Sequence, residues 1–154
     1  MDSRLIIGVP LVFIVAVLQN TGLFSVGGIK ANVIIVVLVA YLFITPTFFD
    51  YCLLLLSAAA GLMPSTGWDM PVTAFIVALI IAYGARRLLP FQPWFGYYAI
   101  LGMSMLILYG IIDAHFILNT PFLFFREVIY TLMGGAFVYG FAVRYYAKRP
   151  RYTF

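Results

Sequence analysis

Residues 94–112 read WFGYYAILGMSMLILYGII, an apolar run without a charged residue that is long enough to cross the hydrocarbon core of a bilayer as one helix. The rest of the chain is similar in character, because hydrophobic residues make up 65% of the 154 residues and charged residues only 9%. A water-soluble domain is about half apolar and about a quarter charged. The composition therefore predicts an all-α integral membrane protein whose solvent is lipid.

Breaks rich in proline, glycine and charge divide the chain into a bundle of about six predicted transmembrane helices, in a single domain over residues 1–154. The first is predicted as an uncleaved helix, because no small-x-small cleavage site follows it. The second and third are short for full spans, so a tilted hairpin is expected there, with a re-entrant pair as the alternative. Pro121 is predicted in the first turn of the last helix, after an N-cap at Asn119 or Thr120. The predicted ranges are 5–24, 31–45, 48–63, 70–88, 94–112 and 123–146.

The basic residues orient this predicted bundle. With the N-terminus in the cytoplasm, seven of the nine Lys and Arg residues fall on the cytoplasmic side, and only Lys30 and Arg126 fall outside. Cytoplasmic loops of membrane proteins carry such an excess of basic residues. Both termini are therefore predicted to be cytoplasmic, and the net charge of +4 is assigned to orientation and not to nucleic-acid binding. The aromatic residues expected at the membrane borders are Trp68 on the outer side and Trp94, Tyr97, Tyr145 and Tyr146 on the inner side.

No set of residues predicts a catalytic, cofactor or metal site. The five acidic residues all fall at or near predicted helix ends, whereas proton-coupled transporters carry ionisable groups in mid-membrane. One His and one Cys leave little for a nucleophile and its base. Asp113 with His115 is too small a set to hold zinc, and a solvated interfacial pair is the simpler interpretation.

Two groups of residues are predicted to make contacts instead. Uncharged polar residues inside the helices are expected to hydrogen-bond neighbouring helices, and they are Asn32, Ser57, Thr73, Ser104 and Thr131. Small residues four apart let helix backbones approach closely, with the internal bundle as the expected use and an outside helix as the alternative. These pairs are Ser57 with Gly61 and Ala136 with Gly140. The candidate contacts with a partner protein are Lys30, Asn32, Asp113, His115, Arg126 and Glu127.

Several stretches of the sequence, taken in order along the chain, carry a resemblance to a known family. Gly28-Ile29-Lys30-Ala31-Asn32 leads into the aliphatic run 33–41, and a small-residue third helix continues through residues 61–67. The fourth helix ends over residues 81–87, and the last runs from Glu127-Val128-Ile129-Tyr130 to a basic tail. Together with the length and the helix count, this order resembles the MreD family of rod shape-determining membrane proteins.

The resemblance implies a non-enzymatic scaffold of the bacterial elongation machinery in the inner (cytoplasmic) membrane, without catalytic residues or cofactors. The implied partner is an MreC-like bitopic protein, and through it the MreB filament and the cell-wall synthases. The implied fold is similar to that of the substrate-binding components of energy-coupling-factor vitamin transporters. Such a vitamin-binding component, or a small channel or passive transporter, is the alternative function.

Overall fold

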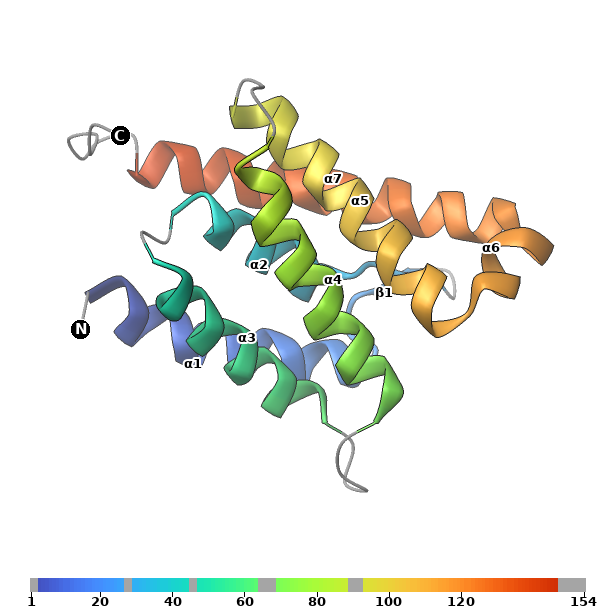
Figure 1. Ribbon diagram of the computed structural model, residues 1–154, viewed down its shortest axis with the longest axis horizontal. Coiled ribbons are helices and arrows are strands. Elements are labelled where there is room, and N and C mark those ends of the chain that lie inside the picture. Colours follow the sequence, from blue (N-terminus) through green and yellow to red (C-terminus); the bar gives the residue numbers. More distant parts are fainter. Residues whose placement is uncertain (1–2, 27–28, 45–46, 64–68, 89–92, 147–154) are drawn as a thin grey trace.

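The computed structural model describes residues 3–26, 29–44, 47–63, 69–88 and 93–146, and most of these residues are helical (Figure 1). The described residues form seven helices, which confirms the predicted all-α fold. Each of the six predicted ranges overlaps one helix, and the six-residue helix α6 is additional. The helices are α1 (Ser3–Asn20), α2 (Val33–Leu42), α3 (Phe48–Leu62), α4 (Met70–Arg86), α5 (Pro93–Ile112), α6 (Ala114–Asn119) and α7 (Pro121–Tyr146).

Apart from the short α6, the helices alternate in direction. α1, α3 and α5 run one way along the molecule, and α2, α4 and α7 return, so that α1 begins and α7 ends toward the same end of the longest axis (Figure 1). α1 packs along α3, α4 packs along α5, and α7 packs against α2 and α5. This arrangement gathers the last residues of α1, α3 and α5 and the first residues of α2 and α4 around one cavity.

Local sequence explains where α4 and α7 begin. Asp69 Oδ1 accepts a hydrogen bond from the Val72 N–H at 3.0 Å, which satisfies one of the free amide groups in the first turn of α4. α7 begins at Pro121 directly after Thr120, as predicted. The Thr120 hydroxyl donates to the Phe116 carbonyl oxygen at 2.8 Å and therefore closes the end of α6.

The segment between α1 and α2 differs from the prediction. α1 ends at Asn20, earlier than the predicted residue 24, and Gly22 turns the chain with a φ of +76°, a conformation that favours glycine. Two short strands follow, β1 (Ser25–Val26) and β2 (Ile29–Lys30), and they pair antiparallel. Strands of two residues carry no alternating pattern that a sequence could reveal.

Helix α2 forms the centre of the bundle. Every residue from Ile34 to Ala40 is buried, and α2 contacts α1, α3, α4, α5 and α7. A helix that is apolar on all sides needs such surroundings. Its ten residues span roughly 15 Å, about half of a hydrocarbon core. This helix is shorter than a full span, and the choice between a tilted hairpin and a re-entrant pair stays a prediction.

Tyr97, one of the aromatic residues predicted at the membrane borders, packs inside the bundle. Its side chain is 0% exposed, its hydroxyl donates to the Val36 carbonyl oxygen at 3.3 Å, and its ring centroid lies 4.8 Å from that of Tyr139. A backbone carbonyl therefore binds this phenol, and its depth in a membrane stays a prediction. Trp94 is exposed. Trp68 and the side chains of Tyr145 and Tyr146 lie outside the described residues.

The Ser57–Gly61 pair lies where α3 packs against α1. A Cβ placed on Gly61 would lie 2.7 Å from the Ala16 Cβ and 2.9 Å from the Phe13 carbonyl oxygen. The Ser57 hydroxyl donates to the Val9 carbonyl oxygen at 2.8 Å on the same face. Only glycine fits at position 61 without moving the two backbones apart.

The Ala136–Gly140 pair does not play the expected internal role. Both residues are exposed, and within the described part of the chain nothing lies within 4 Å of a Cβ placed on Gly140. Gly135 makes the close approach instead, because its Cβ would lie 2.9 Å from Leu101 Cδ2 on α5. The buried face of α7 therefore runs one residue away from the predicted pair.

Candidate functional site

A cavity of about 540 Å³ opens at the end of the bundle where α2 and α4 begin. This volume is within the range of roughly 300–1,000 Å³ that is usual for small-molecule sites. The apolar part of its wall consists of Leu62, Pro71, Val72, Phe75, Leu108 and Ile112. The polar part consists of Gln19, Asn20, Asn32, Asp69 and Tyr109. The cavity thus combines an apolar wall with a few polar groups, the composition typical of a binding site.

A network of amide groups connects this wall to the start of α2. Gln19 Nε2 donates to Asn32 Oδ1 at 2.6 Å, and Gln19 Oε1 accepts from the Ile34 N–H at 2.9 Å. The Asn32 N–H donates to the Thr131 hydroxyl on α7 at 3.1 Å. These bonds satisfy amide groups at the start of a buried helix, which would otherwise lack acceptors. Among the described residues, no acceptor is found for the Asn32 side-chain NH₂ group.

Asn20 and Asp69 fix the ends of the flanking helices. Asn20 Nδ2 donates to the carbonyl oxygens of Gly61 at 3.1 Å and Leu62 at 3.3 Å, which joins the last turn of α1 to that of α3. Asp69 holds its position through the cap that it makes with Val72. Both side chains are therefore positioned on the cavity wall by backbone groups.

Tyr109 connects the cavity to the start of α7. Its hydroxyl donates to the Glu127 carboxylate, and its ring lies against those of Phe116 and Phe124 at centroid distances of 5.5 and 5.6 Å. Because the hydroxyl proton is directed to Glu127, the Tyr109 oxygen can offer only its lone pairs to the cavity.

The opposite end of α2 also has a polar partner. The Arg86 guanidinium donates to the Leu42 carbonyl oxygen and lies 5.5 Å from the centroid of the Phe43 ring. A carbonyl at the end of a buried helix needs such a donor, and a guanidinium over an aromatic face gains a further attraction. Both ends of the central helix are therefore held by side chains of neighbouring helices.

The predicted partner contacts separate into two groups. Asn32 lines the cavity and Glu127 accepts from the lining residue Tyr109, whereas His115 and Arg126 are exposed. Asp113 caps α6 by accepting from the Phe116 N–H at 3.1 Å. The side chain of Lys30 lies outside the described residues. Within the described part of the chain, no group of three His, Cys, Asp or Glu residues could hold a metal ion.

Four cavity residues were not recognised as a site from the sequence: Gln19, Asn20, Asp69 and Tyr109. The adjacent amides Gln19 and Asn20 at the end of an apolar helix were the available signal, because such groups need partners near lipid. Two other polar residues inside helices bond within their own helices. The Ser104 hydroxyl donates to the Ile100 carbonyl oxygen at 2.7 Å, and the Thr73 hydroxyl donates to the carbonyl oxygen of Asp69, the N-cap of α4, at 3.1 Å.

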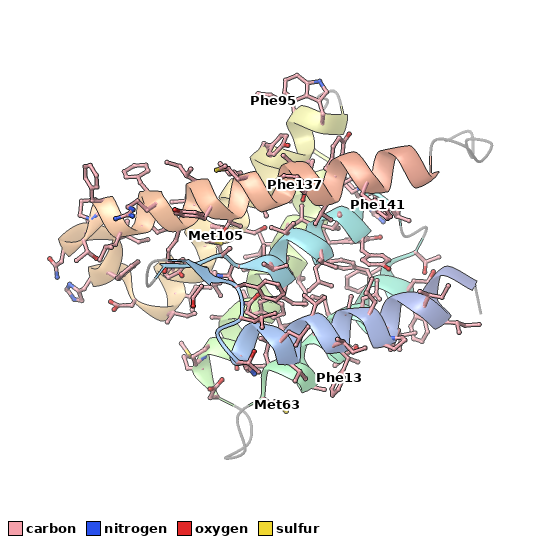
Figure 2. All side chains as sticks on the ribbon, turned by 180° about the vertical axis from the view of Figure 1, so that it is seen from behind. Phe13, Met63, Phe95, Met105, Phe137 and Phe141 are labelled. Carbon is pink, nitrogen blue, oxygen red and sulfur yellow. The ribbon has the colours of Figure 1, made fainter. Side chains whose placement is uncertain are left out.

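A second feature is the exposed face of α7, defined here as Phe125, Ile129, Met133, Ala136, Phe137, Gly140 and Phe141. Its large residues recur every fourth position and form a ridge along the helix, on which Phe137 is 81% exposed. Ala136 and Gly140 lie beside this ridge and make a shallow strip where another helix can approach. Figure 2 shows α7 crossing this side of the molecule, with Phe137 and Phe141 labelled.

Among the described residues, two helical segments are long and apolar enough to cross a membrane, judged by length and composition, and they are Trp94–Ile112 and Pro121–Phe141. Comparison of the chain with protein-family models, with curated proteins and with solved structures found no match.

Proposed function

We propose that the protein is a non-enzymatic subunit of a membrane complex, of the type that the MreD resemblance implies, and that it works by binding a transmembrane helix of a partner. The exposed face of α7 carries this proposal. Large apolar side chains and the small pair Ala136–Gly140 lie on it together, and the small pair has no use inside the bundle. Small residues at this spacing are the usual contact between helices in lipid, where apolar burial alone gives little attraction.

The membrane location is part of this proposal. Many large apolar side chains are exposed on α1, α4 and α7, including Ile7 at 67% and Phe122 at 83%. Soluble monomers rarely expose contiguous apolar patches beyond a few hundred Å². The antiparallel order of the helices fits two cytoplasmic termini in the inner membrane, with the cavity at the outer end. An MreC-like bitopic protein, which contributes one transmembrane helix, is the proposed occupant of the α7 face.

The test is co-purification from a host that has an MreC-like protein. The tagged chain is crosslinked in cells, extracted, and its partners are identified by mass spectrometry. Gly140→Leu places a bulky side chain on the α7 face without a clash inside the bundle. Gly84→Leu is the matched control, because Gly84 is also exposed and no described residue lies within 4 Å of its Cβ position.

We expect the MreC-like protein to be recovered with the wild type and Gly84→Leu, and most of this recovery to be lost with Gly140→Leu. Equal recovery with both variants would remove the α7 face from the proposal, and absence of the partner from all samples would contradict the scaffold function.

A vitamin-binding component is the second proposed function, and the cavity is the observation that favours it. It predicts recovery of an ATPase pair and a large coupling subunit in the same experiment. A channel has less support, because the centre of the bundle is filled by the buried side chains of α2.

A further inference from the structure

We propose that the cavity at the end of the bundle binds a small amphiphilic amine, with the ammonium group at Asp69 and the apolar part against α4 and α5. The proposal is independent of the partner helix at α7. It depends on the shape, the charge and the hydrogen-bonding groups of the cavity wall.

The apolar part of the ligand follows from the wall. Val72 and Phe75 on α4 and Leu108 on α5 are buried residues that also line the cavity. An apolar group placed against them leaves water, and burial of such surface is favourable in proportion to its area. A purely polar ligand would gain no such free energy from contact with these apolar side chains.

The positive charge follows from the ionisable groups. Among the described residues that line the cavity, Asp69 is the one that carries a charge, and none of them is Lys, Arg or His. Glu127, which accepts from the Tyr109 hydroxyl, adds a second carboxylate next to a lining residue. Carboxylates in a wall of low dielectric attract a cation and repel an anion more strongly than they would in water.

The existing hydrogen bonds of the polar wall residues indicate that the ligand should supply hydrogen-bond donors. Both ends of the Gln19 side-chain amide are already hydrogen-bonded, to Asn32 Oδ1 and to the Ile34 N–H. Tyr109 has directed its proton to Glu127, so its oxygen accepts. Asp69 accepts from the Val72 N–H through one oxygen, and a carboxylate has further lone pairs. The Asn32 NH₂ group is a donor without an acceptor among the described residues. The other groups named here accept, and an ammonium group with three N–H donors is their complement.

The experiment uses three probes with a phenyl body and different head groups: 2-phenylethylamine, 2-phenylethanol and 3-phenylpropionate. Binding to the purified full-length chain in detergent is measured by calorimetry and by thermal stabilisation. Asp69→Asn removes the charge but keeps a good N-cap residue. Asp113→Asn is the matched control, because Asp113 caps α6 through the same kind of bond, at 3.1 Å, and is not one of the residues that line the cavity. Ile112→Trp is a second variant that fills the cavity from its half-exposed rim.

We expect the amine to bind at least tenfold more tightly than the alcohol and the carboxylate to bind least. Asp69→Asn should weaken amine binding at least tenfold, Ile112→Trp should abolish it, and Asp113→Asn should leave it unchanged. Equal binding of the three probes, or equal amine binding by wild type, Asp69→Asn and Ile112→Trp, would mean partition into the micelle only and would overturn the proposal. Absence of amine binding to the wild type would overturn it as well.

Discussion

Gly61 should be the position where the bundle tolerates an added methyl group least. In Gly61→Ala, the new Cβ would lie 2.7 Å from the Ala16 Cβ and 2.9 Å from the Phe13 carbonyl oxygen, whereas non-bonded carbon atoms rest at about 3.5–4.0 Å. Neither neighbour can rotate away, because one is a backbone atom and the other is a Cβ. α1 and α3 must therefore separate by about 1 Å, and overpacking of this kind costs about 1–3 kcal/mol.

The control separates this clash from the helix propensity of alanine. Alanine is favoured over glycine inside a helix by about 0.8–1.0 kcal/mol, and Gly102→Ala in α5 should gain this amount because nothing lies within 4 Å of the Gly102 Cβ position. We therefore expect Gly61→Ala to be less stable than Gly102→Ala by about 1–3 kcal/mol.

The assay is equilibrium unfolding by SDS in mixed micelles, followed by circular dichroism. Reaction of Cys52, the one cysteine of the chain, with a thiol dye reports separately on α3, where its side chain is half-buried. Equal free energies of unfolding for Gly61→Ala and Gly102→Ala would refute the close approach of α1 and α3.

Three further substitutions use the same titration. Tyr51→Phe should raise the free energy of unfolding by about 1–3 kcal/mol, because the buried Tyr51 hydroxyl has no hydrogen-bond partner among the described residues, and a loss of stability would point to an unrecognised partner. Gln19→Leu should lower it by about 1–3 kcal/mol, since it deprives the Ile34 N–H of its acceptor, and an unchanged value would contradict the amide network. Ser57→Ala should cost about 0.6 kcal/mol, the usual value of one interhelical hydrogen bond in a membrane, and a cost above about 2 kcal/mol would mean that the Val9 contact has a larger role.

The sequence predicted where the helices lie along the chain but not how they pack against one another. The run 94–112 matches α5 (Pro93–Ile112) because apolar residues between helix breakers have few alternatives. α6 was missed because its six residues are too few to show a helical period. The apolar runs of α2 and α5 also look alike, although α2 is central and part of α5 is exposed. Lipid tails and a protein interior are equally apolar, so composition does not distinguish them.

The site was predicted in part for a related reason. Asn32 and Thr131 were recognised as polar residues that need partners: the Thr131 hydroxyl accepts from the Asn32 backbone N–H, and the Asn32 side chain accepts from Gln19. Gln19 and Tyr109 stand at the ends of two helices far apart in the sequence, and only the packing of α1 beside α2 and of α5 beside α4 brings them to one cavity.

The rotation of α7 decides which surface is left for a partner. Two small-residue rows run along this helix one residue apart, with Gly135 on one and Ala136 on the other, and the spacing alone does not choose between them. The Asn32 N–H needs an acceptor at the start of the buried helix α2, and Thr131 supplies it four residues before Gly135. Gly135 faces α5 on the same side of α7 as Thr131, and this orientation leaves Ala136 and Gly140 exposed. The fold therefore uses one side of α7, and substitutions on the other side can test partner binding without disturbing the bundle.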